Sequence, residues 1–107
     1  MELEKYMLEI DYYYHYIGYD EDDDVMEKEV VYYPVKDLVN KESQVGRLYF
    51  NISSVTADDG SLAGIEIGIM GEKKILTLNE SVKFEDSYKL YDDRESYKRG
   101  IFKLIEK

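Results

Sequence analysis

Hydrophobic and polar side chains alternate along much of this chain, which is typical of β-strands with one buried face. The first alternating stretch covers residues 6–17. One of its faces carries Leu8, Ile10, Tyr12, Tyr14 and Tyr16, and the other carries Glu9, Asp11, Tyr13, His15 and Ile17. Five consecutive acids follow at residues 20–24, and their mutual repulsion predicts a solvated loop. Residues 29–35 predict a second strand ending near Pro34, which lacks a backbone donor. The two strands would form a hairpin with the acidic loop at its tip.

The middle of the chain predicts further strands separated by turns. Residues 36–46 are mostly polar and predict a short helical turn or a loop. Alternation returns over residues 47–56 and 63–70, on either side of Asp58-Asp59-Gly60, a strong turn signal. A second turn is expected at residues 71–73. Two shorter strands are then expected around Leu76 and Leu78 and around Val82 and Phe84.

The C-terminal segment has a different spacing, which favours a helix over residues 94–106. Its apolar positions Tyr97, Ile101, Leu104 and Ile105 follow one another at intervals of four, three and one, as on one side of a helix. Asp92 or Asp93 would serve as the N-cap. A strand over residues 101–105 is the alternative. We therefore predict one α+β domain spanning residues 1–107, with an antiparallel sheet of about five to six strands and a C-terminal helix.

Charge is distributed unevenly along the 107 residues, whose net charge is −10. Residues 1–30 hold eleven acids and two bases, a net charge of −9, whereas residues 31–107 hold thirteen acids and twelve bases, a net charge of −1. Such a negative region attracts basic protein surfaces and repels nucleic acid and anionic membranes. We expect a basic protein surface as the partner, with no direct binding to nucleic acid or membrane.

Tyrosine is unusually frequent, with twelve residues against three phenylalanines and no tryptophan. A tyrosine can bury its ring while its hydroxyl remains in water, which suits binding surfaces. AT-rich coding would also explain this composition, and it would indicate a low-GC bacterium or its phage.

The residues needed for most kinds of catalysis are missing from the sequence. There is no cysteine, His15 is the only histidine, and no serine lies in a Gly-x-Ser-x-Gly motif. The acids at 20–24 resemble the start of a calcium loop, but Val25 and Val31 stand where that loop needs glycine and glutamate. The glycines at 64, 68 and 71 match no phosphate-binding motif. We expect neither an enzyme nor a cofactor or metal site.

The sequence also bears on location. The first residues lack the positive start and apolar run of a secretory signal, and no segment has about 20 consecutive apolar residues. We expect a cytoplasmic protein of a bacterial host, possibly phage-encoded.

These features favour a small acidic inhibitor that blocks a basic, nucleic-acid-binding surface of a partner protein, with carboxylates in the place of phosphates. Phage anti-defence proteins of the anti-CRISPR or anti-restriction type form one such class. The predicted partner-binding residues are Glu9, Asp11, Tyr13, Tyr19, Asp20, Glu21, Asp22, Asp23 and Asp24. One alternative is an immunity protein or antitoxin that neutralises a toxin by the same electrostatics. Another is a structural or assembly module of a phage or cell-surface complex. The acids could also serve only to keep the hairpin soluble and protect its edge.

Overall fold

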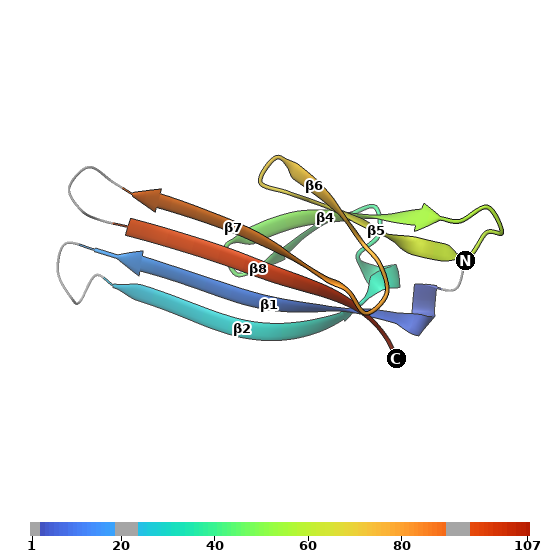
Figure 1. Cartoon of the computed structure of the whole chain (residues 1–107). Helices are drawn as coiled ribbons and strands as arrows, with labels where there is room; N and C mark the ends of the chain where they lie inside the picture. Colours follow the sequence, from blue (N-terminus) through green and yellow to red (C-terminus); the bar gives the residue numbers. More distant parts are fainter. Residues whose placement is uncertain (1–2, 19–23, 90–94) are drawn as a thin grey trace.

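The computed structural model describes residues 3–18, 24–89 and 95–107, and it is built almost entirely of β-strands (Figure 1). Eight strands occur among these residues: β1 (Tyr6–Ile17), β2 (Val25–Pro34), β3 (Glu42–Val45), β4 (Leu48–Thr56), β5 (Leu62–Ile69), β6 (Glu72–Leu76), β7 (Ser81–Lys89) and β8 (Glu95–Glu106). Two short 3-10 helices, η1 (Leu3–Lys5) and η3 (Val35–Asp37), complete the described elements.

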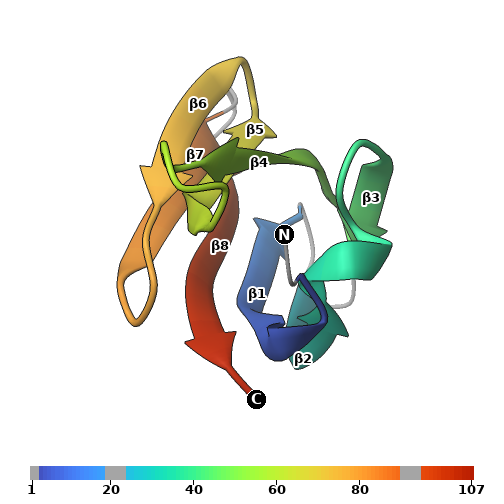
Figure 2. The ribbon, with the colours of Figure 1, turned by 90° about the vertical axis from the view of Figure 1, so that its right-hand side faces the viewer.

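The strands form two antiparallel sheets. Sheet A has the order β2-β1-β8-β7, and sheet B has the order β3-β4-β5-β6. The view along the strands shows the two sheets on opposite sides of a common interior (Figure 2). The predicted hairpin is present, because β1 and β2 pair in register from Met7 with Pro34 to Tyr16 with Val25.

The core lies between the sheets and is made of the inward-facing half of each alternating pattern. Phe102 lies at its centre, with its ring centroid 5.3 Å from that of Phe50 in sheet B and 5.6 Å from that of Phe84 in sheet A. These three rings are almost completely buried. Burial of a side chain of this size stabilises the fold by about 1.5–3 kcal/mol, so the rings are an important part of the contact between the sheets.

The predicted C-terminal helix is wrong, and with it the α+β class. Residues 95–106 form β8, which is hydrogen-bonded between β1 and β7 at the centre of sheet A. In a strand neighbouring side chains point to opposite faces, so Leu104 is buried in the core whereas Ile105 faces outward. Gly100 also fits the strand, because a Cβ there would lie 2.5 Å from Cδ2 of Leu48 in the opposite sheet.

Other segments also differ from the sequence-based expectation. Residues 36–46 contain the end of η3, which is the expected helical turn, but also the unexpected strand β3. The second strand begins at Val25 rather than at residue 29, and β6 already begins at Glu72. All six strand pairs are antiparallel, as expected, but they belong to two sheets instead of one.

The two sheets are displaced along the strand direction, so one end of sheet A extends beyond sheet B (Figure 1). The molecule measures 56 × 23 × 22 Å as a result. Burial along the inner face of β7 shows where the cover ends, because Phe84 is 2% exposed and Tyr88 is 61% exposed. The end of β1, the end of β7 and the start of β8 all lie at this uncovered end, since Glu95 pairs with Ile17 and with Lys89.

Candidate functional site

The two unusual features of the sequence are its excess of acids and its many tyrosines, and both concentrate in the stretches that contain the uncovered end of sheet A. We define this projecting end as the described residues 13–18, 24–28, 85–89 and 95–99. The sequence stretches 13–28 and 85–99, to which these strand ends belong, hold seven of the twelve tyrosines, and their eleven acids and five bases give a net charge of −6 out of the −10 of the whole chain. Its strands present side chains on two faces, an outer face that points away from sheet B and an inner face that continues from the core.

The outer face carries a group of aromatic and charged side chains. The Tyr13 ring lies 5.9 Å from the ring of Tyr97 and 6.4 Å from that of His15. The Arg99 guanidinium carbon lies 5.5 Å from the centre of the Tyr13 ring, and Arg99 Nη2 lies 3.4 Å from Asp11 Oδ1. This pair is partly shielded from solvent, so the Asp11 charge is largely balanced within the protein.

Tyr97 connects this group to the neighbouring strand β7. Its hydroxyl donates a 2.8 Å hydrogen bond to Glu85 Oε2. The hydrogen bond from the protonated phenol to this carboxylate raises the pKa of Tyr97 above its ordinary value. The ring is therefore neutral at physiological pH and offers a contact surface that is polar at one end.

The structure brings together three of the residues predicted to bind a partner. Glu9, Asp11 and Tyr13 all lie on the outer face of β1, where Glu9 is in register with Tyr32 of β2 and Lys103 of β8. Asp24 accepts a 2.9 Å hydrogen bond from the backbone N–H of Gly18 and so joins the two ends of the β1–β2 connection. The other predicted residues lie outside the described part of the chain: Tyr19, Asp20, Glu21, Asp22 and Asp23.

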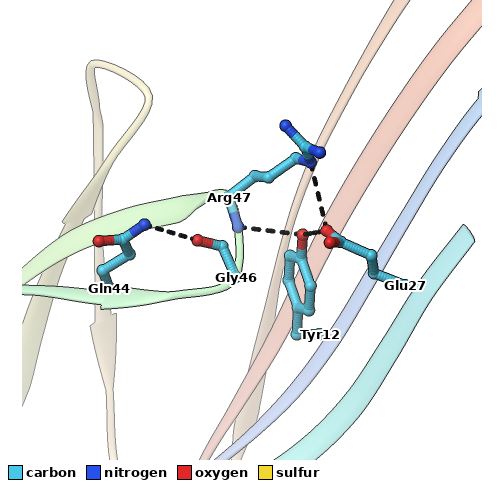
Figure 3. A network of polar contacts seen from close by, with 5 residues as sticks. All are labelled: Tyr12, Glu27, Gln44, Gly46 and Arg47. Atoms are coloured by element: carbon cyan, nitrogen blue, oxygen red, sulfur yellow. Dashed lines mark hydrogen bonds and ion pairs between the residues drawn. The ribbon is translucent and has the colours of Figure 1, made fainter. Parts of the chain in front are cut away.

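On the inner face a polar network marks the boundary between the covered and projecting parts of sheet A (Figure 3). The Tyr12 hydroxyl accepts a 3.0 Å hydrogen bond from the backbone N–H of Arg47 and donates a 2.8 Å hydrogen bond to Glu27 Oε1. Arg47 Nε also donates to Glu27 Oε1, at 3.2 Å. The Arg47 guanidinium carbon lies 4.6 Å from the centre of the Tyr14 ring. The turn before β4 is thus attached to both strands of the first hairpin.

Comparison with known proteins gives no family for the chain. No family model, curated protein or solved structure matches it. The function must therefore be inferred from the site itself. Within residues 3–18, 24–89 and 95–107, no group of three or more histidine, cysteine or carboxylate side chains could hold a metal ion. The same residues contain no helix long and apolar enough to cross a membrane.

Sequence reasoning missed the inner face of the projecting end. The alternation predicts that Tyr14 and Tyr16 lie on the core side of the strand, but both are only half-buried. Tyr14 lies at the margin of the core and is covered by the Arg47 guanidinium. Asp86 and Tyr88 of β7 lie on the same inner face as Phe84. The polar residue Asp86 in an inward position was the available signal that the core ends before it.

Proposed function

We propose that this protein is a small acidic inhibitor that binds a basic, nucleic-acid-binding surface of a partner protein through the projecting end of sheet A. One observation carries the proposal: most of the excess acid and most of the tyrosines belong to the two sequence stretches, 13–28 and 85–99, whose described strand ends sheet B leaves uncovered. Carboxylates would steer a basic partner towards this end, and tyrosine rings would provide the buried contact area.

The size of the projecting end supports a specific contact. Four strands spaced about 4.8 Å apart give a width of about 19 Å, and five residues at about 3.4 Å each give a length of about 17 Å. The two faces together then offer about 650 Å², close to the roughly 800 Å² per partner of a typical stable complex. A partner that contacts both faces would thus bury nearly the area of such a complex.

The charge of the projecting end also indicates which kind of partner fits. In a second copy of the chain, the stretches 13–28 and 85–99 carry the same net charge of −6, and like charges in contact oppose association. A surface that normally binds nucleic acid carries clustered Lys and Arg and offers the opposite charge. The charge therefore favours a basic partner over self-association through this end.

A pull-down with two variants of equal net charge tests the proposal. The first variant replaces the acids at residues 20–24 by their amides. The second replaces five exposed acids outside the projecting end by their amides: Asp37, Glu42, Asp58, Glu72 and Glu80. Each variant has a net charge of −5, so only the position of the lost charge differs. Tagged wild type and both variants would be incubated with a low-GC bacterial lysate at about 50 and about 500 mM salt.

We expect the wild type and the second variant to capture the same basic protein at low salt, and the first variant to lose it. Raising the salt shortens the screening length from above 10 Å to below 5 Å, so capture by the wild type should weaken strongly. Equal capture by both variants, or capture that is indifferent to salt, would refute the proposal. The captured protein also decides the subclass, because a defence nuclease indicates an anti-defence protein and a toxin indicates an immunity protein.

A further inference from the structure

Strand β2 forms one edge of sheet A and is the longest edge strand in the described part of the chain. Its ten residues pair with β1 in an unbroken register, and its other side has no partner strand among the described residues. In the view along the strands, β2 lies at the margin of the molecule (Figure 2). A long edge without a bulge presents unpaired backbone N–H and C=O groups to which another strand can bind.

The other three sheet edges are protected in ways that β2 is not. Strands β3 and β6 have only four and five residues, and Glu72, Lys73 and Lys74 make up most of β6. Strand β7 has nine residues, of which four are charged, and its Lys83 carbonyl accepts a 2.8 Å hydrogen bond from Lys74 Nζ. Short strands and charged side chains are common means of preventing edge-to-edge pairing. The protection is weakest at β2, whose charged residues are confined to positions 27–29.

The outer face of β2 is also apolar and exposed. Met26, Val30 and Tyr32 are 69%, 49% and 53% exposed, and all three point to this face because they alternate along the strand. They are three of the nine large hydrophobic side chains that are exposed among the described residues. Exposed apolar side chains gathered on one strand are typical of an interaction surface. An open edge and an apolar face therefore coincide on β2.

The charges of β2 determine how two copies of this strand can pair. In a symmetric antiparallel pair, the residue on the two-fold axis faces its own copy. An axis at Lys28 or Glu29 would place like charges directly opposite each other, which is destabilising. With Val30 on the axis, residues 26–34 of the two copies pair, and each of the three charged residues faces a tyrosine or a valine. The sequence of β2 therefore permits a long self-paired ladder in this register.

The same register keeps the two acidic ends apart. Val25 begins β2 at the projecting end and lies five residues from the axis, so the two copies of Val25 would be about 34 Å apart. The screening length at physiological salt is about 8 Å. Repulsion between the two projecting ends is therefore weak in this arrangement, and neither end is covered by the other.

We propose that β2 pairs with β2 of a second copy of the chain, antiparallel about Val30, and joins the two A sheets into one sheet of eight strands. Nine paired residues give an edge about 31 Å long, and a height of about 10 Å gives a contact of about 300 Å² per copy. A typical stable complex buries about 800 Å² per partner, so this dimer is weak and dissociates on dilution. The inference does not depend on the proposed function.

Sedimentation equilibrium of the full chain from about 10 µM to about 1 mM tests the dimer, because a weak dimer follows mass action. We expect the mean mass to rise from that of one chain towards that of two. Val30→Lys places two like charges on the axis and should weaken association about five-fold. Ile75→Lys is the matched control and should not weaken it. Ile75 lies on edge strand β6 and is 57% exposed, it faces Glu66 as Val30 faces Asp11, and both variants have a net charge of −9.

A mixing experiment shows whether Val30 itself lies on the axis. Val30→Glu alone should associate as weakly as Val30→Lys, but an equimolar mixture of the two variants places opposite charges on the axis and should associate more strongly than either alone. Circular dichroism confirms that each variant is folded. A wild type that stays monomeric up to about 1 mM would overturn the proposal and leave the β2 edge for a strand of another protein. Equal weakening by Val30→Lys and Ile75→Lys, or no gain on mixing, would also overturn it.

Discussion

The junction between the two sheets makes a strong prediction about Gly46. This residue lies between β3 and β4 with a φ of 56°, in the left-handed region. A Cβ at this position would lie 2.3 Å from Cε2 of the buried Tyr12 ring. We expect Gly46→Ala to lower the free energy of unfolding by about 2–5 kcal/mol. About 1–2 kcal/mol comes from the left-handed backbone and about 1–3 kcal/mol from forcing the ring aside.

Gly71→Ala is the matched control for the backbone contribution. Gly71 also has a positive φ, of 77°, but an added Cβ would meet nothing within 4 Å. This variant should therefore lose only the about 1–2 kcal/mol of backbone strain. Urea unfolding followed by circular dichroism measures both free energies, and unchanged m-values would show that the comparison is valid. If the two variants lose the same stability within about 0.5 kcal/mol, the packing of Tyr12 against Gly46 does not hold the sheets together.

Two further predictions concern hydroxyl groups. Burial, and to a smaller extent Glu27, raise the pKa of Tyr12 above its ordinary value of 10.0. The protonated Tyr12 side chain therefore stabilises the fold fully below pH 10, and this stabilisation is lost as the pH rises through the folded-state pKa. Tyr12→Phe should lower the free energy of unfolding at pH 7 by about 1–3 kcal/mol. Above pH 10 the free energy of unfolding of this variant should fall less steeply with pH than that of the wild type, and an equally steep fall would contradict this cause. Hydrogen bonds from the Ser61 hydroxyl and backbone N–H lower the pKa of Asp59. Ser61→Ala should therefore raise the pKa of Asp59 in a carboxyl NMR titration. An unchanged pKa would show that the Ser61 hydroxyl does not cause the shift.

The first hairpin could be predicted from sequence because its information is local. Strict alternation over residues 6–17 defines two faces, and the acid run that follows prevents the strand from continuing. The same alternation placed Glu9, Asp11 and Tyr13 together, and the structure keeps them on one face of β1. Their neighbours could not be predicted, because Arg99 is 88 residues from Asp11 in the chain and only the sheet order brings them together.

The C-terminal strand shows where local patterns mislead. Tyr97, Ile101, Leu104 and Ile105 fit one side of a helix, yet both faces of β8 carry apolar residues because one packs in the core and the other covers the outer side of the sheet. A central strand with apolar residues on both faces loses its period-two signal. Gly100 was the informative residue, because a glycine weakens a helix but permits the close approach of Leu48 from the opposite sheet.

The Tyr12 ring links the fold to the proposed function, because it marks the last inward position that sheet B covers. Beyond it, Arg47 extends from sheet B over Tyr14, so the first uncovered tyrosine is occupied by an arginine of the same chain. Arg47 also donates a hydrogen bond to Glu27, so its side chain joins the turn before β4 to both strands of the first hairpin. Arg47→Ala should therefore lower the free energy of unfolding by about 0.5–1 kcal/mol, because the ion pair with Glu27 and the contact with the Tyr14 ring are both lost. An unchanged free energy of unfolding in urea would show that these exposed contacts do not hold the junction together.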